Sequence, residues 1–270
     1  MRSLPQSSSL RHRTPSDDAW TLNIERPTRI RLKDYGEGRA QLTYQQLSCF
    51  QGLTDKQRRL YMVYERRSPE EERQRSTTRA RIKLRDAIMC LGADRILTCT
   101  TRRCITDPVE FNLYLAKFIR RMPSLVPGWK CVAALELQER GAIHAHLAVR
   151  GFQNIAKARL LWAKIIGEEP AGQLDLSNPF DCVEHAFYIV KYVGKDLGEF
   201  ERPRYGHHYK RCRGLKPIVE EVVLTSMNVV EVERQCQLLI ENHGYKVRSS
   251  FREVTSHPYW LRRGSFRCCR

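Results

Sequence analysis

The chain has 270 residues, of which 41% are hydrophobic, enough for one large domain or for a catalytic domain with extensions. No run approaches the roughly 20 apolar residues of a membrane-spanning helix, and the polar, arginine- and serine-rich start argues against a secretory signal. The net charge of +17 and the sequence pI of about 9.7 favour a polyanionic partner, above all nucleic acid, over a merely solvated basic surface.

The ten cysteines do not have the spacing of a zinc module, because the sequence contains no C-x-x-C pair. Several lie inside apolar runs, as Cys99 does, where a thiol packs as a small hydrophobic group. We therefore predict a reduced, intracellular protein without a zinc module.

The first 92 residues divide into two predicted parts. Residues 1–55 are a poorly defined N-terminal extension, and residues 56–92 are a basic helical segment. Within it, Ser68 can cap a helix that begins at Pro69, carries three acids in its first turn and ends at Gly92. The arginines of this helix either cover phosphates or face water, and the sequence leaves both readings open.

Residues 93–216 alternate between strands and helices. The predicted elements are a strand over 95–101, a helix over 107–121, a β-hairpin over 130–150, a helix over 154–167 and a helix over 181–197. The hairpin makes the sheet at least partly antiparallel, so we predict an α+β layer fold. Residues 217–270 are a C-terminal basic extension with one predicted helix, over 226–242.

The second strand of the hairpin carries a candidate metal site. Alternation along a strand places His144 and His146 on one face and the apolar residues between and around them on the other. Glu139, Arg140 and Gly141 fit a three-residue turn, and symmetry about Arg140 then sets Glu136 opposite His144. Two imidazoles and a carboxylate suit Mg²⁺, Mn²⁺ or another divalent ion. An H-x-H arises by chance easily, so the registered Glu136 carries the prediction, whereas Glu139 reads as a solvated turn carboxylate.

The predicted helix over 181–197 carries two tyrosines one turn apart. Tyr188 and Tyr192 leave the same face, and Lys191 and Lys195 each follow a tyrosine by three residues. A phenol with a pKa of about 10 is a poor nucleophile at neutral pH, and a nearby cation favours the phenolate or binds a phosphate. A packing stripe is the alternative interpretation; the metal-ready hairpin and the basic chain favour a nucleophile.

These motifs resemble the HUH endonucleases, specifically the two-tyrosine rolling-circle replication initiators of small single-stranded DNA phages and plasmids. The resemblance covers about residues 95–200 and rests on three motifs in the family's order: the strand over 95–101, His144-Ala145-His146, and the segment from Tyr188 to Lys195. The stretch from Tyr205 to Leu215 also looks like sequence that follows the third motif. The resemblance implies a central antiparallel sheet of about five strands, with helices on its faces and the metal on the central strands.

The resemblance also implies a mechanism. A metal held by His144, His146 and Glu136 polarises a scissile phosphate of single-stranded DNA at a replication origin. One tyrosine attacks, becomes joined to the 5′-phosphate and frees a 3′-hydroxyl for a polymerase, and the second tyrosine can repeat the attack after one round. Because the sequence has no G-x-x-x-x-G-K-[ST] phosphate loop, unwinding would need a host helicase, which favours a phage or plasmid in a bacterial cytoplasm.

A basic stretch after the tyrosines is the predicted DNA contact. Residues 202–216 combine six basic side chains with two tyrosines and no acid, a mixture suited to phosphates and stacked bases, although an exposed basic loop is the alternative. The six predicted contacts are Arg202, Arg204, Lys210, Arg211, Arg213 and Lys216.

Three rival functions are weighed against the replication initiator. A two-tyrosine transposase uses the same chemistry but usually carries a cysteine-rich zinc module. A conjugative relaxase typically places its tyrosines before the histidine motif, and here they follow it. A non-catalytic DNA-binding regulator would need neither Tyr188 nor Tyr192, and no clear helix-turn-helix is evident.

Overall fold

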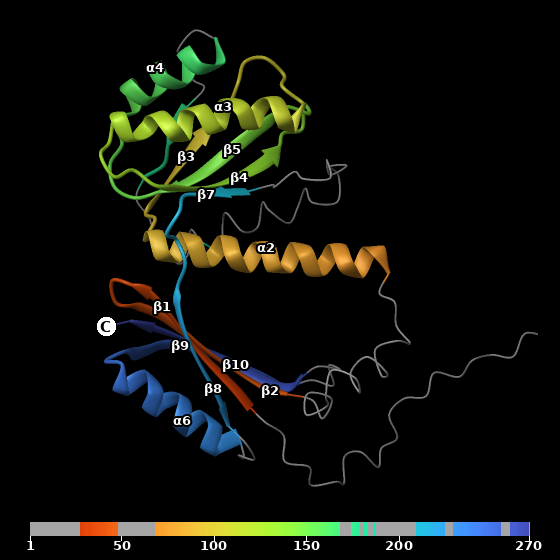
Figure 1. Cartoon of the computed structure of the whole chain (residues 1–270), viewed down its shortest axis with the longest axis vertical. Helices are drawn as coiled ribbons and strands as arrows, with labels where there is room; N and C mark the ends of the chain where they lie inside the picture. Colours follow the sequence, from red (N-terminus) through yellow and green to blue (C-terminus); the bar gives the residue numbers. More distant parts are fainter. Residues whose placement is uncertain are drawn as a thin grey trace, which may run out of the picture.

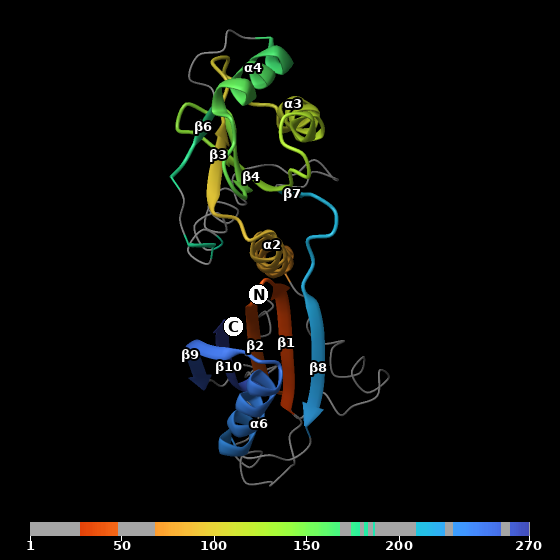
Figure 2. The ribbon, with the colours of Figure 1, turned by 90° about the vertical axis from the view of Figure 1, so that its left-hand side faces the viewer.

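The computed structural model of the protein describes residues 28–47, 68–167, 174–178, 181–182, 186, 209–224, 229–254 and 260–269. Within these ranges the fold is α+β, with two five-stranded sheets in which every strand pair is antiparallel. Figures 1 and 2 show the two sheets at opposite ends of the molecule, with one long helix between them.

The first sheet, here called the histidine sheet, contains the predicted hairpin. Its strand order is β6 (Leu174–Leu176), β3 (Arg95–Cys99), β5 (Ile143–Val149), β4 (Cys131–Leu137) and β7 (Tyr209–Arg211). The hairpin strands β4 and β5 thus lie near the middle, as predicted. The α+β class, and the antiparallel sheet of about five strands that the resemblance implied, are confirmed.

Helices cover both faces of the histidine sheet, which explains why its strands are apolar on both sides. On one face, Leu147 and its neighbours pack against α3 (Pro108–Arg121) and α4 (Ile155–Ile166), where Phe111, Phe118 and Trp162 are fully buried. A short 3-10 turn, η3 (Met122–Ser124), follows α3. On the other face, Ala148 and its neighbours pack against the C-terminal part of α2 (Pro69–Leu91).

The helix boundaries follow the predicted caps closely. Ser68 and Glu71 form a reciprocal capping box at the start of α2, and Gly92 ends the helix in the left-handed conformation. Asp107 caps α3 and Asn154 caps α4, because each side chain accepts hydrogen bonds from backbone N–H groups of the first turn. Short-range polar chemistry therefore fixed these ends, and the sequence contained that chemistry.

The second sheet, here called the terminal sheet, joins segments from both ends of the described chain. Its order is β8 (Ile218–Leu224), β1 (Thr28–Gly36), β2 (Arg39–Leu47), β10 (Trp260–Cys269) and β9 (Lys246–Val254). The helix α6 (Val229–Asn242), predicted over 226–242, packs on the face that carries Leu32, Leu42 and Phe266. The sequence analysis assigned no strands to these segments, and the predicted division of the chain into 1–55, 56–92, 93–216 and 217–270 stays a prediction.

The helix α2 contacts both sheets. Its residue Asp86 accepts hydrogen bonds from Lys33 Nζ at 2.7 Å and from Tyr35 Oη at 3.1 Å, both on β1. Burial, with the charge of Asp86 next in weight, raises the pKa of Tyr35 far above its usual range, so this phenol stays protonated. The buried half of α2 is thus the polar joint between the two sheets.

Nine cysteines fall in the described part of the chain, and all of them are free thiols, consistent with the predicted reduced state. Among the described helices, none combines the length and apolar character needed to cross a membrane.

Candidate metal centre

Glu136, His144 and His146 converge on one point of the histidine sheet. Glu136 on β4 lies directly opposite His144 on β5, the register that symmetry about Arg140 predicted. The Nε2 atoms of His144 and His146 lie 2.6 and 2.7 Å from the same oxygen, Glu136 Oε2. One ligand atom from each of the three residues lies within 4.8 Å of the other two. The two imidazole rings meet nearly edge to face, with centroids 4.6 Å apart.

The tight turn between β4 and β5 produces this register. Gly141 takes a left-handed conformation, with φ of 80°, and Gln138 N–H donates to the carbonyl of Ala142 at 2.9 Å. A slip of one residue would move His144 and His146 to the α3 face, so the turn decides which face carries the cluster.

Two polar side chains orient the histidines from behind. Thr98 on β3 lies opposite His146 and places its Oγ1 3.2 Å from His146 Nδ1. Gln138 places its Nε2 3.2 Å from His144 Nδ1, and Arg140 Nε donates to Gln138 Oε1 at 3.0 Å. Such outer contacts fix the orientation of metal-binding imidazoles. The sequence analysis missed both residues, although Thr98 was inside the first motif and Gln138 lies two residues beyond Glu136 in the same hairpin.

The protonation states suit cation binding. Burial by itself raises the pKa of Glu136, but hydrogen bonds from His144 and His146 outweigh it, and the net pKa is lower than usual. Burial lowers the pKa of His146, and the hydrogen bond to Glu136 offsets only part of that effect. At neutral pH the centre therefore holds an ionised carboxylate beside a neutral imidazole at His146.

The donor set fits a divalent cation. The short distances from each Nε2 to one carboxylate oxygen require a proton on each Nε2, since two lone pairs would repel each other at that separation. A cation can replace those protons and draw on the same three atoms. The set of two nitrogens and a carboxylate is compatible with several divalent ions and does not single out one of them.

The α2 face of the sheet also carries the start of the segment that contains the predicted nucleophile. Ala186, two residues before Tyr188 in the sequence, is fully buried in the same core cluster as Ala134 and Ala148. Ala134 lies opposite His146, so this cluster adjoins the metal centre. Tyr188, Lys191, Tyr192 and Lys195 themselves lie outside the described residues, as do Arg202 and Arg204.

The remaining predicted DNA contacts are divided between the two faces of β7 and the loop after it. Arg211 lies opposite Val132, on the α2 face, and is exposed. Lys210 points to the other face, where its Nζ donates to the carbonyl of Asn112 on α3 at 3.0 Å and burial lowers its pKa. Arg213 and Lys216 are exposed beyond β7. Arg211 is therefore better placed than Lys210 to meet DNA bound at the metal centre.

One comparison with known proteins matches this part of the chain. The model of a family described as "Replication-associated protein ORF2" matches residues 94–197, a range that contains β3, the metal centre and both tyrosines, but less than half of the chain. No curated protein and no solved structure gives a significant match. Over the matched range, the chain is similar to replication-associated proteins.

Proposed function

We propose that the protein nicks single-stranded DNA at a replication origin and starts rolling-circle replication as a two-tyrosine HUH initiator. The observation that carries the proposal is the cluster of Glu136, His144 and His146 on the middle strands of an antiparallel sheet. The same residues lie inside the range that matches the replication-associated family.

In this proposal, Glu136, His144 and His146 hold Mg²⁺ or Mn²⁺, which supplies the positive charge that polarises the scissile phosphate. Thr98 and Gln138 keep the imidazoles aimed at that point. Arg211, which lies on the same face, is available to neutralise a neighbouring phosphate.

The two tyrosines supply the nucleophiles. The phenolic oxygen of Tyr188 or Tyr192 forms a bond to phosphorus, the bond from phosphorus to the 3′-oxygen breaks, and that oxygen takes up a proton. The products are a 5′-phosphotyrosine and a free 3′-hydroxyl, from which a host polymerase extends while a host helicase unwinds. Lys191 and Lys195 favour the phenolate form or bind the phosphate. Ala186 supports this assignment, because the chain enters the tyrosine segment on the face of the metal centre.

The test is formation of a covalent adduct between protein and DNA. The full chain is incubated with a pool of labelled single-stranded oligonucleotides and Mn²⁺ or Mg²⁺, and the products are separated on denaturing gels. An adduct is expected that chelation abolishes and that the double variant Tyr188→Phe/Tyr192→Phe no longer forms. Tyr114→Phe is the matched control, because Tyr114 lies on α3, on the opposite face of the sheet.

A DNA-binding regulator without catalysis makes the opposite prediction. It would bind the oligonucleotides without forming an adduct under any metal, and replacing both tyrosines by phenylalanine would leave its function intact. A two-tyrosine transposase would form the same adduct, but it would rejoin the ends of a mobile element instead of supporting synthesis from an origin plasmid.

A further inference from the structure

The terminal sheet carries polar side chains on the face that α6 does not cover. Alternation puts Arg31, Thr43 and Ser265 on that face, opposite in direction to the apolar residues that pack on α6. Among the described elements, only the C-terminal part of α2 packs against this face, and it does so at one end. The residues of this polar face are Arg29, Arg31, Lys33, Gln41, Thr43, Ser249, Phe251, Ser265 and Arg267.

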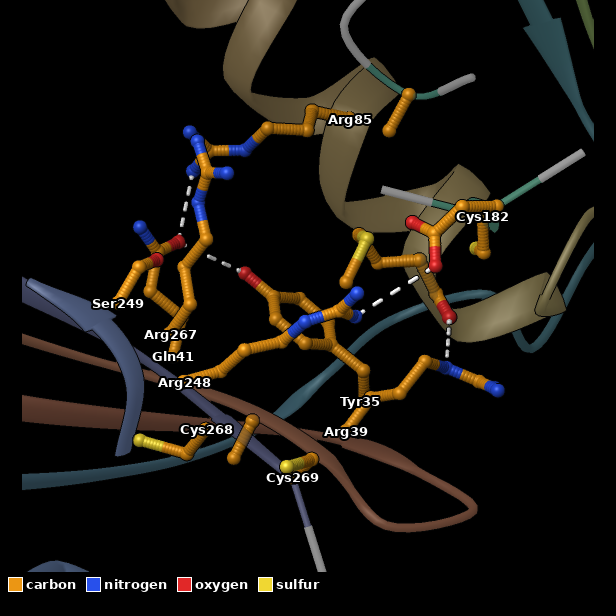
Figure 3. Close-up of a pocket in the computed structure, with 14 residues that line it drawn as sticks. Tyr35, Arg39, Gln41, Arg85, Cys182, Arg248, Ser249, Arg267, Cys268 and Cys269 are labelled. Carbon is orange, nitrogen blue, oxygen red and sulfur yellow. Dashed lines mark hydrogen bonds and ion pairs between the residues drawn. The ribbon is translucent and has the colours of Figure 1, made fainter. Parts of the chain in front are cut away.

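A pocket of about 490 Å³ lies where the polar face meets α2. Four arginines line it, each from a different element: Arg39 from β2, Arg85 from α2, Arg248 from β9 and Arg267 from β10. Figure 3 shows these side chains gathered around one hollow, with Gln41 and Ser249 beside them. Asp181 is the only carboxylate among its described lining residues, so the pocket has an excess of positive charge.

Two of the arginines are held in place by the protein. Arg85 Nη2 donates to Gln41 Oε1 at 3.1 Å, and Arg39 Nε donates to the carbonyl of Met89 at 3.2 Å. The other two are exposed at the mouth: Arg248 is 64% exposed and lies 3.5 Å from Asp181 Oδ2. Fixed guanidinium groups at the base with exposed ones at the rim form a preorganised anion site.

The neighbourhood of the pocket favours a polymeric anion over a small one. Basic and hydroxyl groups continue from the pocket along the polar face, through Arg31 and Lys33 on β1 and Thr43 on β2. Phe251 on β9 is 54% exposed on the same face, paired with Ser265 and two residues from the pocket's Ser249. An exposed aromatic ring among arginines suits a base beside the phosphates that the arginines bind.

We infer that the polar face and its arginine-lined pocket form a second DNA-binding surface, separate from the metal centre and across α2 from it. The guanidinium groups bind backbone phosphates, and Phe251 stacks on a base. This inference rests on the proposed function for the identity of the polymer, since it places DNA that extends beyond the nicked segment. The helix α2 lies between both sites, and its exposed N-terminal half is rich in arginine.

The experiment measures binding of a mixed-sequence single-stranded oligonucleotide to the full chain by fluorescence anisotropy over a series of salt concentrations. The test variant is Arg248→Ala/Arg267→Ala, which removes two exposed side chains and leaves the fixed Arg39 and Arg85 intact. The control is Arg120→Ala/Arg121→Ala, which removes the same charge from the exposed end of α3, on the far face of the histidine sheet. Thermal unfolding of both variants checks that each is folded.

We expect the pocket variant to bind about tenfold more weakly than the control. Its salt dependence should also be less steep, by about 0.7 in the logarithmic slope for each phosphate that an arginine no longer neutralises. Phe251→Ala should weaken binding without changing that slope, because a stacked ring releases no counterion. Equal affinities and slopes in the two double variants would overturn the inference.

Two further outcomes separate this inference from the proposed nicking. If the wild-type chain forms no adduct but only the pocket variant loses DNA affinity, the nicking proposal fails and the second surface stands. If a nucleoside triphosphate binds the wild type and not the pocket variant, while both double variants bind DNA alike, the pocket is a nucleotide site and the DNA assignment is wrong.

Discussion

The two sheets of the molecule use polar residues in different ways. In the histidine sheet both faces are covered, so the polar residues of its hairpin strands gather at one place, around Glu136, His144 and His146. In the terminal sheet α6 covers one face, and the polar residues spread along the other face instead. A polar residue among buried neighbours needs a specific reason, whereas a polar residue on an open face can be mere solvation. The first sheet therefore identifies its site by the identity of three residues, and the second only by their accumulation of charge.

The largest expected effect breaks this contrast at the metal centre. Glu136→Gln keeps the size of the side chain but removes the negative charge that faces both imidazoles. We expect adduct formation to fall by at least about 100-fold, which corresponds to a loss of roughly 3 kcal/mol of transition-state stabilisation. The matched control is Glu139→Gln, at the exposed turn of the same hairpin, which should leave the rate unchanged. Equal losses in the two variants would show that charge near the hairpin matters, and not the centre itself.

The next prediction concerns the joint between the sheets. Asp86→Ala leaves Lys33 Nζ and Tyr35 Oη without their shared partner, in a place where the Lys33 side chain is only 13% exposed. Removing one member of a buried ion pair costs about 3–5 kcal/mol of unfolding free energy. Urea titration should show this loss and, because the joint couples the sheets, a transition that separates into two. Asp175→Ala is the control: its side chain is 81% exposed and lies 3.9 Å from Arg159, so its removal should cost little. A single transition in Asp86→Ala would mean that the sheets are coupled by other contacts.

The difference between the sheets also explains how far the sequence could predict the structure. The metal centre comes from a hairpin in which Glu136 and His146 are only ten residues apart, and the turn residues Glu139 to Gly141 set the register locally. The terminal sheet depends on pairs such as Arg31 with Glu221, which are 190 residues apart and have no local signal. Its strand β8 is exposed over nearly its whole length, so its sequence lacks the alternation that would have revealed it.

The residues missed at the site itself were missed for a related reason. Thr98 contacts His146 from β3, a strand that lies 48 residues earlier in the sequence. Its role follows from the pairing of β3 with β5, which the strand pattern alone does not determine. Arg39, Arg248 and Arg267 likewise meet only because β2, β9 and β10 are neighbours.

A smaller effect is expected from the residue behind His144. When a cation occupies Nε2, the imidazole proton moves to Nδ1, and the side chain at position 138 must then accept it. Gln138→Leu cannot accept, so Mn²⁺ affinity measured by calorimetry should fall about tenfold. Gln138→Glu keeps an acceptor and should restore the affinity. If both variants bind Mn²⁺ as the wild type does, Gln138 is a bystander and Thr98 alone orients the pair.

The smallest effect tests whether α2 is one unit or two. Its first turns, up to Lys83, make few buried contacts, while Leu84 and the residues after it are packed between the sheets. Ser68→Ala removes the capping box, which costs about 1 kcal/mol of local helix stability. Because that half of the helix is exposed, the loss should appear as faster hydrogen exchange over residues 70–80, with the global unfolding temperature nearly unchanged. Slower DNA association in this variant, with unchanged Mn²⁺ affinity, would indicate that the arginines of this half contact phosphates. An unchanged association rate would indicate that they face water, and the DNA path between the two sheets would then run without α2.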